Sequence, residues 1–87
     1  MQYEWDRAKA ETNLAKHSVA FEAVEGFEWD DALVFASLGR GEPRLGALGV
    51  IGDRLHFLVY SIETRCVRVI SLRKANRKEV GFYEQKD

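Results

Sequence analysis

The second half of the chain consists of apolar, β-prone runs separated by short polar turns. Leu45–Ile51 and Leu55–Ile62 are two such runs, and Gly52-Asp53 between them is a two-residue turn signal. Arg65–Leu72 follows after a tight connection at Glu63-Thr64. The pattern therefore predicts a meander of three adjacent antiparallel strands.

The first third of the chain has the residue pattern of helices. Tyr3–Trp5 predicts a brief edge strand, and the Asp6 carboxylate can accept hydrogen bonds from the first turn of a helix over residues 7–16. That segment is rich in good helix formers, and its alanines and Leu14 offer a modest apolar stripe. A second, shorter helix is expected over Phe21–Phe27.

Three further segments complete the expected fold. Ala32–Phe35 is compatible with one more strand, and residues 38–43 have the Gly and Pro content of a loop. Asn76 followed by Glu79 forms a capping-box signature at the start of a last helix. The element order predicts an α+β fold in which two N-terminal helices and one C-terminal helix pack on a single antiparallel sheet. At this length one domain over residues 1–87 is expected.

The formal net charge of −1 conceals a polarised chain. Residues 1–38 carry three cations and eight acids, whereas residues 39–87 carry ten cations and six acids. Six cations without an intervening acid fall within residues 65–78: Arg65, Arg68, Arg73, Lys74, Arg77 and Lys78. Such a basic region is typical of proteins that bind a polyanion, although solvated surface charge would produce the same run.

Residue types that the chain lacks exclude several classes of protein. A single cysteine rules out an internal disulfide framework and a Cys-based metal site. No apolar run approaches the roughly 20 residues that span a bilayer, and the first six residues lack the segments of a signal peptide. No paired histidines or acidic cluster have the spacing of metal ligands, and no phosphate-binding glycine loop occurs. We therefore expect a cytoplasmic protein without metal or cofactor.

The strand pattern singles out Arg73 as a candidate phosphate ligand. Strict alternation along the third strand predicts one face with Val67, Val69, Ser71 and Arg73, and another with Arg68, Ile70 and Leu72. Arg73 then emerges at the strand end beside Lys74 and a helix N-terminus, where its planar donor fork suits phosphate oxygens. Pairing with Glu79 would explain the same residue structurally.

Lys16-His17 and Tyr83 are the candidates for proton transfer. Both residues of the first pair lie where the first helix should end, and the helix dipole favours cations there, so capping alone accounts for them. The functional alternative is a titratable group at an exposed turn that serves acid–base chemistry. Tyr83 is expected in the core or at an interface, unless its hydroxyl takes part in the chemistry.

Motifs spread over nearly the whole chain occur in an order typical of one family. They are Glu4-Trp5-Asp6-x-x-Lys9-x-x-x-Asn13-x-x-Lys16-His17, Val19-x-Phe21-x-x-Val24, Arg44 before a glycine-bearing strand, Arg68-Val69-Ile70-Ser71-Leu72-Arg73-Lys74-Ala75, and the trailing Glu79 and Tyr83. This combination resembles the BrnT family, the toxins of type II toxin–antitoxin pairs. Two positions depart from the family pattern: Ser18 stands where Gly is usual, and Leu72 where Ala is usual.

The resemblance implies a RelE-like fold and a metal-independent endoribonuclease that inhibits translation. It also implies a ribbon-helix-helix antitoxin (BrnA-like) as partner, with operator DNA bound only through that antitoxin. RNA cleavage without metal needs a base, an acid and cations that stabilise the phosphorane. Arg73 and Arg44 are expected to supply that charge, with Lys16 as a further cation, and His17 before Tyr83 to transfer protons. RNA contacts are expected from Arg65, Arg68, Ser71, Lys74, Arg77 and Lys78.

The sequence leaves three alternatives open. The first is a catalytically inactive toxin homologue that serves as an antitoxin- or nucleic-acid-binding module. The second is a toxin of the same fold that acts on a protein target such as DNA gyrase. The third is a small domain whose charge asymmetry has no binding role.

Overall fold

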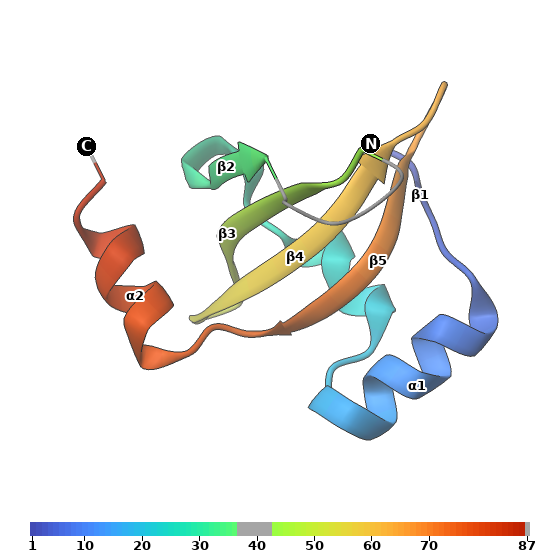
Figure 1. Ribbon diagram of the computed structural model, residues 1–87, viewed down its shortest axis with the longest axis horizontal. Coiled ribbons are helices and arrows are strands. Elements are labelled where there is room, and N and C mark those ends of the chain that lie inside the picture. The colour runs from blue at the N-terminus through green and yellow to red at the C-terminus, as the bar shows by residue number, and fades with distance from the viewer. Residues whose placement is uncertain (37–42, 87) are drawn as a thin grey trace.

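A five-stranded sheet with strand order β1-β5-β4-β3-β2 forms the centre of the molecule (Figure 1). The computed structural model describes residues 1–36 and 43–86. The strands are β1 (Tyr3–Glu4), β2 (Leu33–Ala36), β3 (Leu45–Ile51), β4 (Arg54–Ile62) and β5 (Val67–Lys74). The antiparallel meander of β3, β4 and β5 is confirmed, and β2 adds a further antiparallel strand.

The sheet is mixed, so the expected purely antiparallel sheet is wrong. β1 pairs parallel with β5 through Tyr3 and Val67, and the Val67 N–H donates to the Gln2 carbonyl at 2.8 Å. No hairpin connects β1 to its neighbour, because the helices and three strands separate the two in sequence. The direction of β1 is therefore set by tertiary packing, which the turn signals used for the meander do not report.

The helices also differ from the expected arrangement. The first is the α-helix α1 (Arg7–His17), but the second is a 3₁₀ helix, η1 (Phe21–Gly26), followed by the short η2 (Trp29–Asp31). The C-terminal helix α2 (Arg77–Glu84) stands beside the end of the sheet, away from α1 (Figure 1). The loop expected over 38–43 lies outside the described residues except for Pro43. No helix in the described part of the chain is long and apolar enough to cross a membrane.

Side chains at both ends of α1 determine where this helix begins and ends. The Asp6 Oδ1 accepts hydrogen bonds from the N–H groups of Ala8 (2.8 Å) and Lys9 (3.1 Å). At the other end Ser18 has φ 60° and ψ 28°, and its N–H donates to the Leu14 carbonyl at 2.9 Å. Ser18 thus adopts the left-handed conformation that glycine prefers, so the departure from the family's Gly leaves the helix end in place.

The sheet separates a larger core from a smaller one. On the face towards α1 and η1, called here the α1 face, the buried residues form one cluster: Val19, Phe21, Val24, Phe27, Ala47, Leu58, Tyr60, Val67, Val69 and Leu72. Gly49 belongs to this packing, because a Cβ there would lie 2.4 Å from the Phe27 ring. On the opposite α2 face a smaller cluster of Leu48, Leu55 and Ala75 packs against Val80 and Tyr83 of α2.

A β-bulge in β5 changes which side chains share a face. Val59 pairs with Ser71 and Tyr60 with Val69, so Ile70 is an extra residue without a partner in β4. Beyond the bulge the alternation is reversed, and Leu72 is fully buried in the same core as Val69. The prediction from strict alternation is therefore wrong for this strand: Ser71 and Arg73 share the α2 face with Arg68.

Asn13 ties α1 to the edge of β5. Its side chain is 6% exposed, its Nδ2 donates to the carbonyls of Leu72 (2.7 Å) and Val19 (3.0 Å), and its Oδ1 accepts from the Leu72 N–H (3.2 Å). β1 covers this edge of β5 only as far as Arg68. The Asn13 amide therefore makes the hydrogen bonds to the Leu72 N–H and carbonyl that a neighbouring strand would otherwise make.

Candidate functional site

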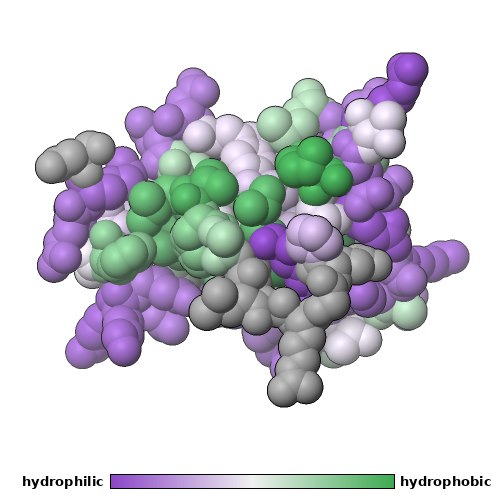
Figure 2. All heavy atoms as spheres, turned by 45° about the horizontal axis from the view of Figure 1, so that its top comes forward, coloured by the Kyte–Doolittle hydropathy of each residue, from purple (hydrophilic) through white to green (hydrophobic). Residues whose placement is uncertain are grey.

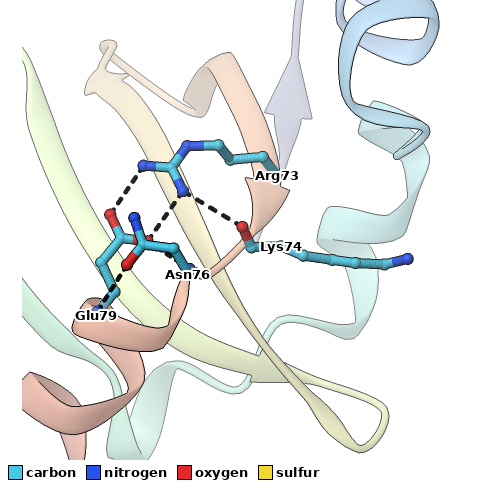
Figure 3. Close-up of polar contacts among 4 residues, drawn as sticks. All are labelled: Arg73, Lys74, Asn76 and Glu79. Atoms are coloured by element: carbon cyan, nitrogen blue, oxygen red, sulfur yellow. Dashed lines mark hydrogen bonds and ion pairs between the residues drawn. The ribbon is translucent and has the colours of Figure 1, made fainter.

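Arg73 is held in one orientation by its neighbours on the α2 face (Figure 3). Its Nη1 and Nη2 donate to the two Glu79 carboxylate oxygens at 2.9 and 2.8 Å, and Nη1 lies 3.3 Å from the Lys74 carbonyl. Glu79 is itself fixed by the capping box, because its Oε1 accepts from the Asn76 N–H at 2.9 Å. The Arg73 hydrogen bonds lower the pKa of the Glu79 carboxyl, so the ion pair is fully formed at neutral pH.

An aromatic pair supports the same guanidinium from the sheet. The Arg73 Cζ lies 4.8 Å from the centroid of the Phe57 ring, and Phe57 in turn stacks on Phe35 at 5.7 Å with 12° between the ring planes. Gly46 makes room for this stack, because a Cβ there would lie 2.8 Å from the Phe35 ring. Three planar groups therefore follow one another across the α2 face and end at Glu79.

Arg44 lies towards the opposite end of the sheet from Arg73. It precedes β3 and lines a cavity of about 470 Å³ with Ser61 and Glu63. Its Nε is buried and has no hydrogen-bond partner among the described residues. Leu45 pairs with Tyr60 whereas Arg73 pairs with Phe57, so the two arginines are roughly 13 Å apart along the strands. The two side chains therefore lie in different surroundings, Arg44 at this cavity and Arg73 beside Glu79 and Phe57.

Tyr83 lies on α2 in the cluster that contains Phe57, on which Arg73 rests. Its hydroxyl donates to the Asp31 carbonyl at 3.1 Å, and the Lys86 Nζ lies 4.7 Å from the centre of its ring. Tyr83 therefore shares the α2 face with Arg73.

Lys16 and His17 lie elsewhere, in a groove between α1 and the edge of β5. The α1–β5 groove has a volume of about 330 Å³ and is lined by Ala8, Lys9, Thr12, Asn13, Lys16, His17, Ile70 and Ser71. Both basic residues belong to the last turn of the helix, as expected for cations at a C-terminus. Only Ser71 among the expected site residues of β5 reaches this groove, so the expected proton-transfer residues His17 and Tyr83 are not brought together.

The six expected cations of residues 65–78 do not form one continuous patch. Arg68 lies near the start of β5 and is bonded to Glu4 at 2.9 Å, and exposed Arg65 precedes that strand. Lys74 ends β5 and points away from Arg73 (Figure 3). The exposed Arg77 and Lys78 begin α2. The run therefore divides into two groups at opposite ends of β5.

Exposed apolar residues add a second kind of surface. Figure 2 shows apolar side chains gathered in one area, with hydrophilic side chains on either side. The large apolar residues exposed in the described chain include Val34 (49%) on the edge strand β2, Ile62 (64%) at the end of β4 and Phe82 (60%) on α2. Such surface is typical of a protein that binds a partner.

The sequence analysis named Glu79 as a possible partner of Arg73, which the ion pair confirms, but it missed Phe57. Glu79 was expected to cap α2 and to offer an alternative explanation for Arg73, and Phe57 was part of a strand pattern. The Asn-x-x-Glu motif indicates that the Glu79 carboxylate is held in place by the helix cap, and a carboxylate held in this way can orient the Arg73 guanidinium. Nothing in the local sequence indicates that Phe57 contacts Arg73, because the bulge at Ile70 sets that register. Within the described residues, no three His, Cys, Asp or Glu side chains gather as a possible metal site.

The comparison with known families supplies the class of protein. Residues 5–79 match the family described as the ribonuclease toxin, BrnT, of type II toxin–antitoxin systems. Toxins of such pairs act with a cognate antitoxin, and this family consists of ribonucleases. The chain belongs to the BrnT family, as its motifs predicted. A search of curated proteins finds no match.

Proposed function

We propose that this toxin is a metal-independent endoribonuclease that inhibits translation in the cytoplasm, with Arg73 acting on the scissile phosphate. The observation that carries the proposal is the orientation of Arg73 by Glu79 on one side and Phe57 on the other. A guanidinium fixed before substrate binds stabilises the phosphorane without reorganisation during the reaction. An RNA phosphate would accept from the Nε and the remaining Nη2 donor of Arg73, while the pair with Glu79 is kept.

We propose roles for the other site residues according to where they lie relative to Arg73. Arg44 lines a separate cavity, so we assign it to a neighbouring phosphate, with Lys16 as a further cation. Tyr83 shares the α2 face with Arg73, which supports it as the group that protonates the leaving 5′-oxygen. His17 lines the α1–β5 groove, away from Arg73 and Tyr83, so this proposal gives it no part in proton transfer at that phosphate. Arg65, Arg68, Ser71, Lys74, Arg77 and Lys78 are proposed to contact RNA on either side.

The purified protein should cleave RNA in the presence of excess EDTA. Because the attacking nucleophile is the 2′-hydroxyl, the products should end in 2′,3′-cyclic phosphate or 3′-phosphate, which mass spectrometry of the fragments distinguishes from 3′-hydroxyl ends. Loss of cleavage on chelation would show that the reaction needs a metal ion. RNA that is bound but left intact would instead support a non-catalytic binding module.

We also propose that the partner is a ribbon-helix-helix antitoxin that covers α2 and brings operator DNA to the complex. The exposed cations Arg77 and Lys78 and the 60% exposed Phe82 lie on this helix, so they offer charge and apolar area to an acidic, amphipathic segment. Electrostatic attraction of this kind raises the association rate more than the final affinity.

Reversing the charges of Arg77 and Lys78 together should slow antitoxin association and flatten its dependence on salt, with a smaller change in dissociation. Stopped-flow measurements across a salt series test this. Arg7→Glu, at the exposed start of α1, is the control for a charge reversal away from α2. An association rate unaltered by the double reversal would place the antitoxin on another surface.

A further inference from the structure

We propose that the α1–β5 groove is a second RNA site, which binds a backbone phosphate of the strand beyond the scissile position. The proposal rests on the ribonuclease function proposed above and extends it to a surface outside the Arg73 cluster. Three basic residues line the groove, Lys9, Lys16 and His17, and no carboxylate does. The exposed Thr12 adds a hydroxyl group, which can donate to a phosphate oxygen.

The helix presents these residues on one side by their spacing. Lys9, Thr12, Asn13 and Lys16 recur at intervals of three and four residues, so they line one stripe of α1. The acid of the helix lies elsewhere, because Glu11 lines a different cavity with Arg7, to which it is paired at 3.9 Å. α1 therefore separates a purely basic stripe from a mixed one.

Helix electrostatics accounts for two of the cations but not for the third. Lys16 and His17 are favourable in the last turn of α1, but Lys9 lies in the first turn, where the helix dipole disfavours a cation. Within residues 1–36 and 43–86, Lys9 forms no ion pair that would offset this placement. The Asp6 carboxylate caps this turn, and the exposed ammonium group of Lys9 is available to an anionic ligand in the groove.

The wall formed by β5 connects the groove with the catalytic surface. β1 covers the edge of β5 only as far as Arg68, and Asn13 occupies the backbone groups of Leu72, so the bulge residues Ile70 and Ser71 are left to line the groove. Ser71 also shares the α2 face with Arg73, two residues further on and about 7 Å away along the strand. A single RNA strand can therefore pass from Arg73 over Ser71 into the groove. This continuity favours RNA over an acidic segment of the antitoxin as the occupant.

The test measures binding without cleavage, using a 2′-O-methyl RNA oligonucleotide that lacks the nucleophile. Fluorescence anisotropy across a salt series should show that Lys9→Gln weakens binding about 3- to 10-fold and reduces the slope of log K against log salt by roughly 0.7, as for one lost phosphate contact on a single strand. Lys9→Arg should retain the slope. The matched control is Arg7→Gln, which removes the same charge from the same helix outside the groove.

Each outcome of this experiment decides the proposal. Equal effects of Lys9→Gln and Arg7→Gln would show that only long-range electrostatic attraction is lost, which would overturn the proposed site. Unchanged RNA binding by Lys9→Gln would overturn it too. Weaker antitoxin binding with unchanged RNA binding would assign the groove to the antitoxin, which also overturns it. If Lys9→Gln loses RNA affinity as expected but the parent protein does not cleave natural RNA, the groove is supported as an RNA site and the ribonuclease proposal is refuted. Failure of the one proposal can therefore be told from failure of the other.

Discussion

Replacing Arg73 with alanine should lower the rate of RNA cleavage by about 10²–10³-fold, the loss that follows removal of a key electrostatic donor. The guanidinium is already oriented by Glu79 and Phe57, so its contribution to the transition state requires little reorganisation. Initial rates on a defined RNA under single-turnover conditions measure this loss directly. The pair with Arg73 lowers the pKa of the Glu79 carboxyl, so the orienting carboxylate stays charged at neutral pH and further into the acid range than an ordinary glutamate.

Two variants separate the catalytic role of Arg73 from a structural one. Arg73→Lys keeps the charge but loses the donor fork, so it should restore only part of the rate. Arg54→Ala, an exposed cation at the start of β4, should retain the full rate. The Asn76 capping contact with the Glu79 N–H does not involve Arg73, so Arg73→Ala should keep the far-UV circular-dichroism spectrum of the parent protein. Full activity of Arg73→Ala, or loss of its folded state, would show that Arg73 serves only a structural role by pairing with Glu79.

The fold could be predicted from the sequence wherever local signals determine the structure. The Gly52-Asp53 turn joins two β-prone runs, and the capping pair of Asn76 and Glu79 begins α2, so both features were predicted correctly. The parallel pairing of β1 was not predicted, because two residues carry no periodicity and no turn fixes their direction. The second helix was expected from its apolar spacing, which does not distinguish a 3₁₀ helix from an α-helix over six residues.

The bulge at Ile70 had the largest consequence for the predicted site. Strict alternation assigned Arg73 to the same face as Val69, and the extra residue moves it to the α2 face. Arg73 was nevertheless a sound candidate, because its place at the strand end depends on the strand boundary and not on the face. The contact with Phe57 depends on the register after the bulge, so no local pattern could show it.

Asn13 shows the limit of hydrophobic patterning in a second way. A polar residue between Thr12 and Leu14 has no signal for burial, yet Asn13 is 6% exposed while Leu14 is 51% exposed. The reason is the free edge of β5: the backbone groups of Leu72 need partners, and an amide supplies a donor and an acceptor together. Asn13 is part of the family motif, but its burial is explained only by its hydrogen bonds to β5.

The hydrogen bonds lost in Asn13→Ala should cost about 3 kcal/mol of stability, at roughly 1 kcal/mol for each of those that join Asn13 to Leu72 and Val19. The higher helix propensity of alanine offsets about 0.5 kcal/mol of this loss. For a domain of this size the remaining change should lower the midpoint of thermal unfolding by about 10–20 °C. Thermal and urea unfolding followed by circular dichroism measure both quantities.

The exposed neighbour Thr12 is the matched control, because Thr12→Ala changes the same helix without touching β5 and should stay within about 0.5 kcal/mol of the parent protein. Asn13→Asp is the more demanding variant: it keeps the acceptor for the Leu72 N–H but turns a carboxylate towards the carbonyls of Leu72 and Val19. It should therefore be at least as unstable as Asn13→Ala above the pKa of the new carboxyl, and recover as the pH falls and that group is protonated. If Asn13→Ala were no less stable than Thr12→Ala, solvent would satisfy the edge of β5 equally well, and the amide would have no part in holding α1 against the strand that carries Arg73.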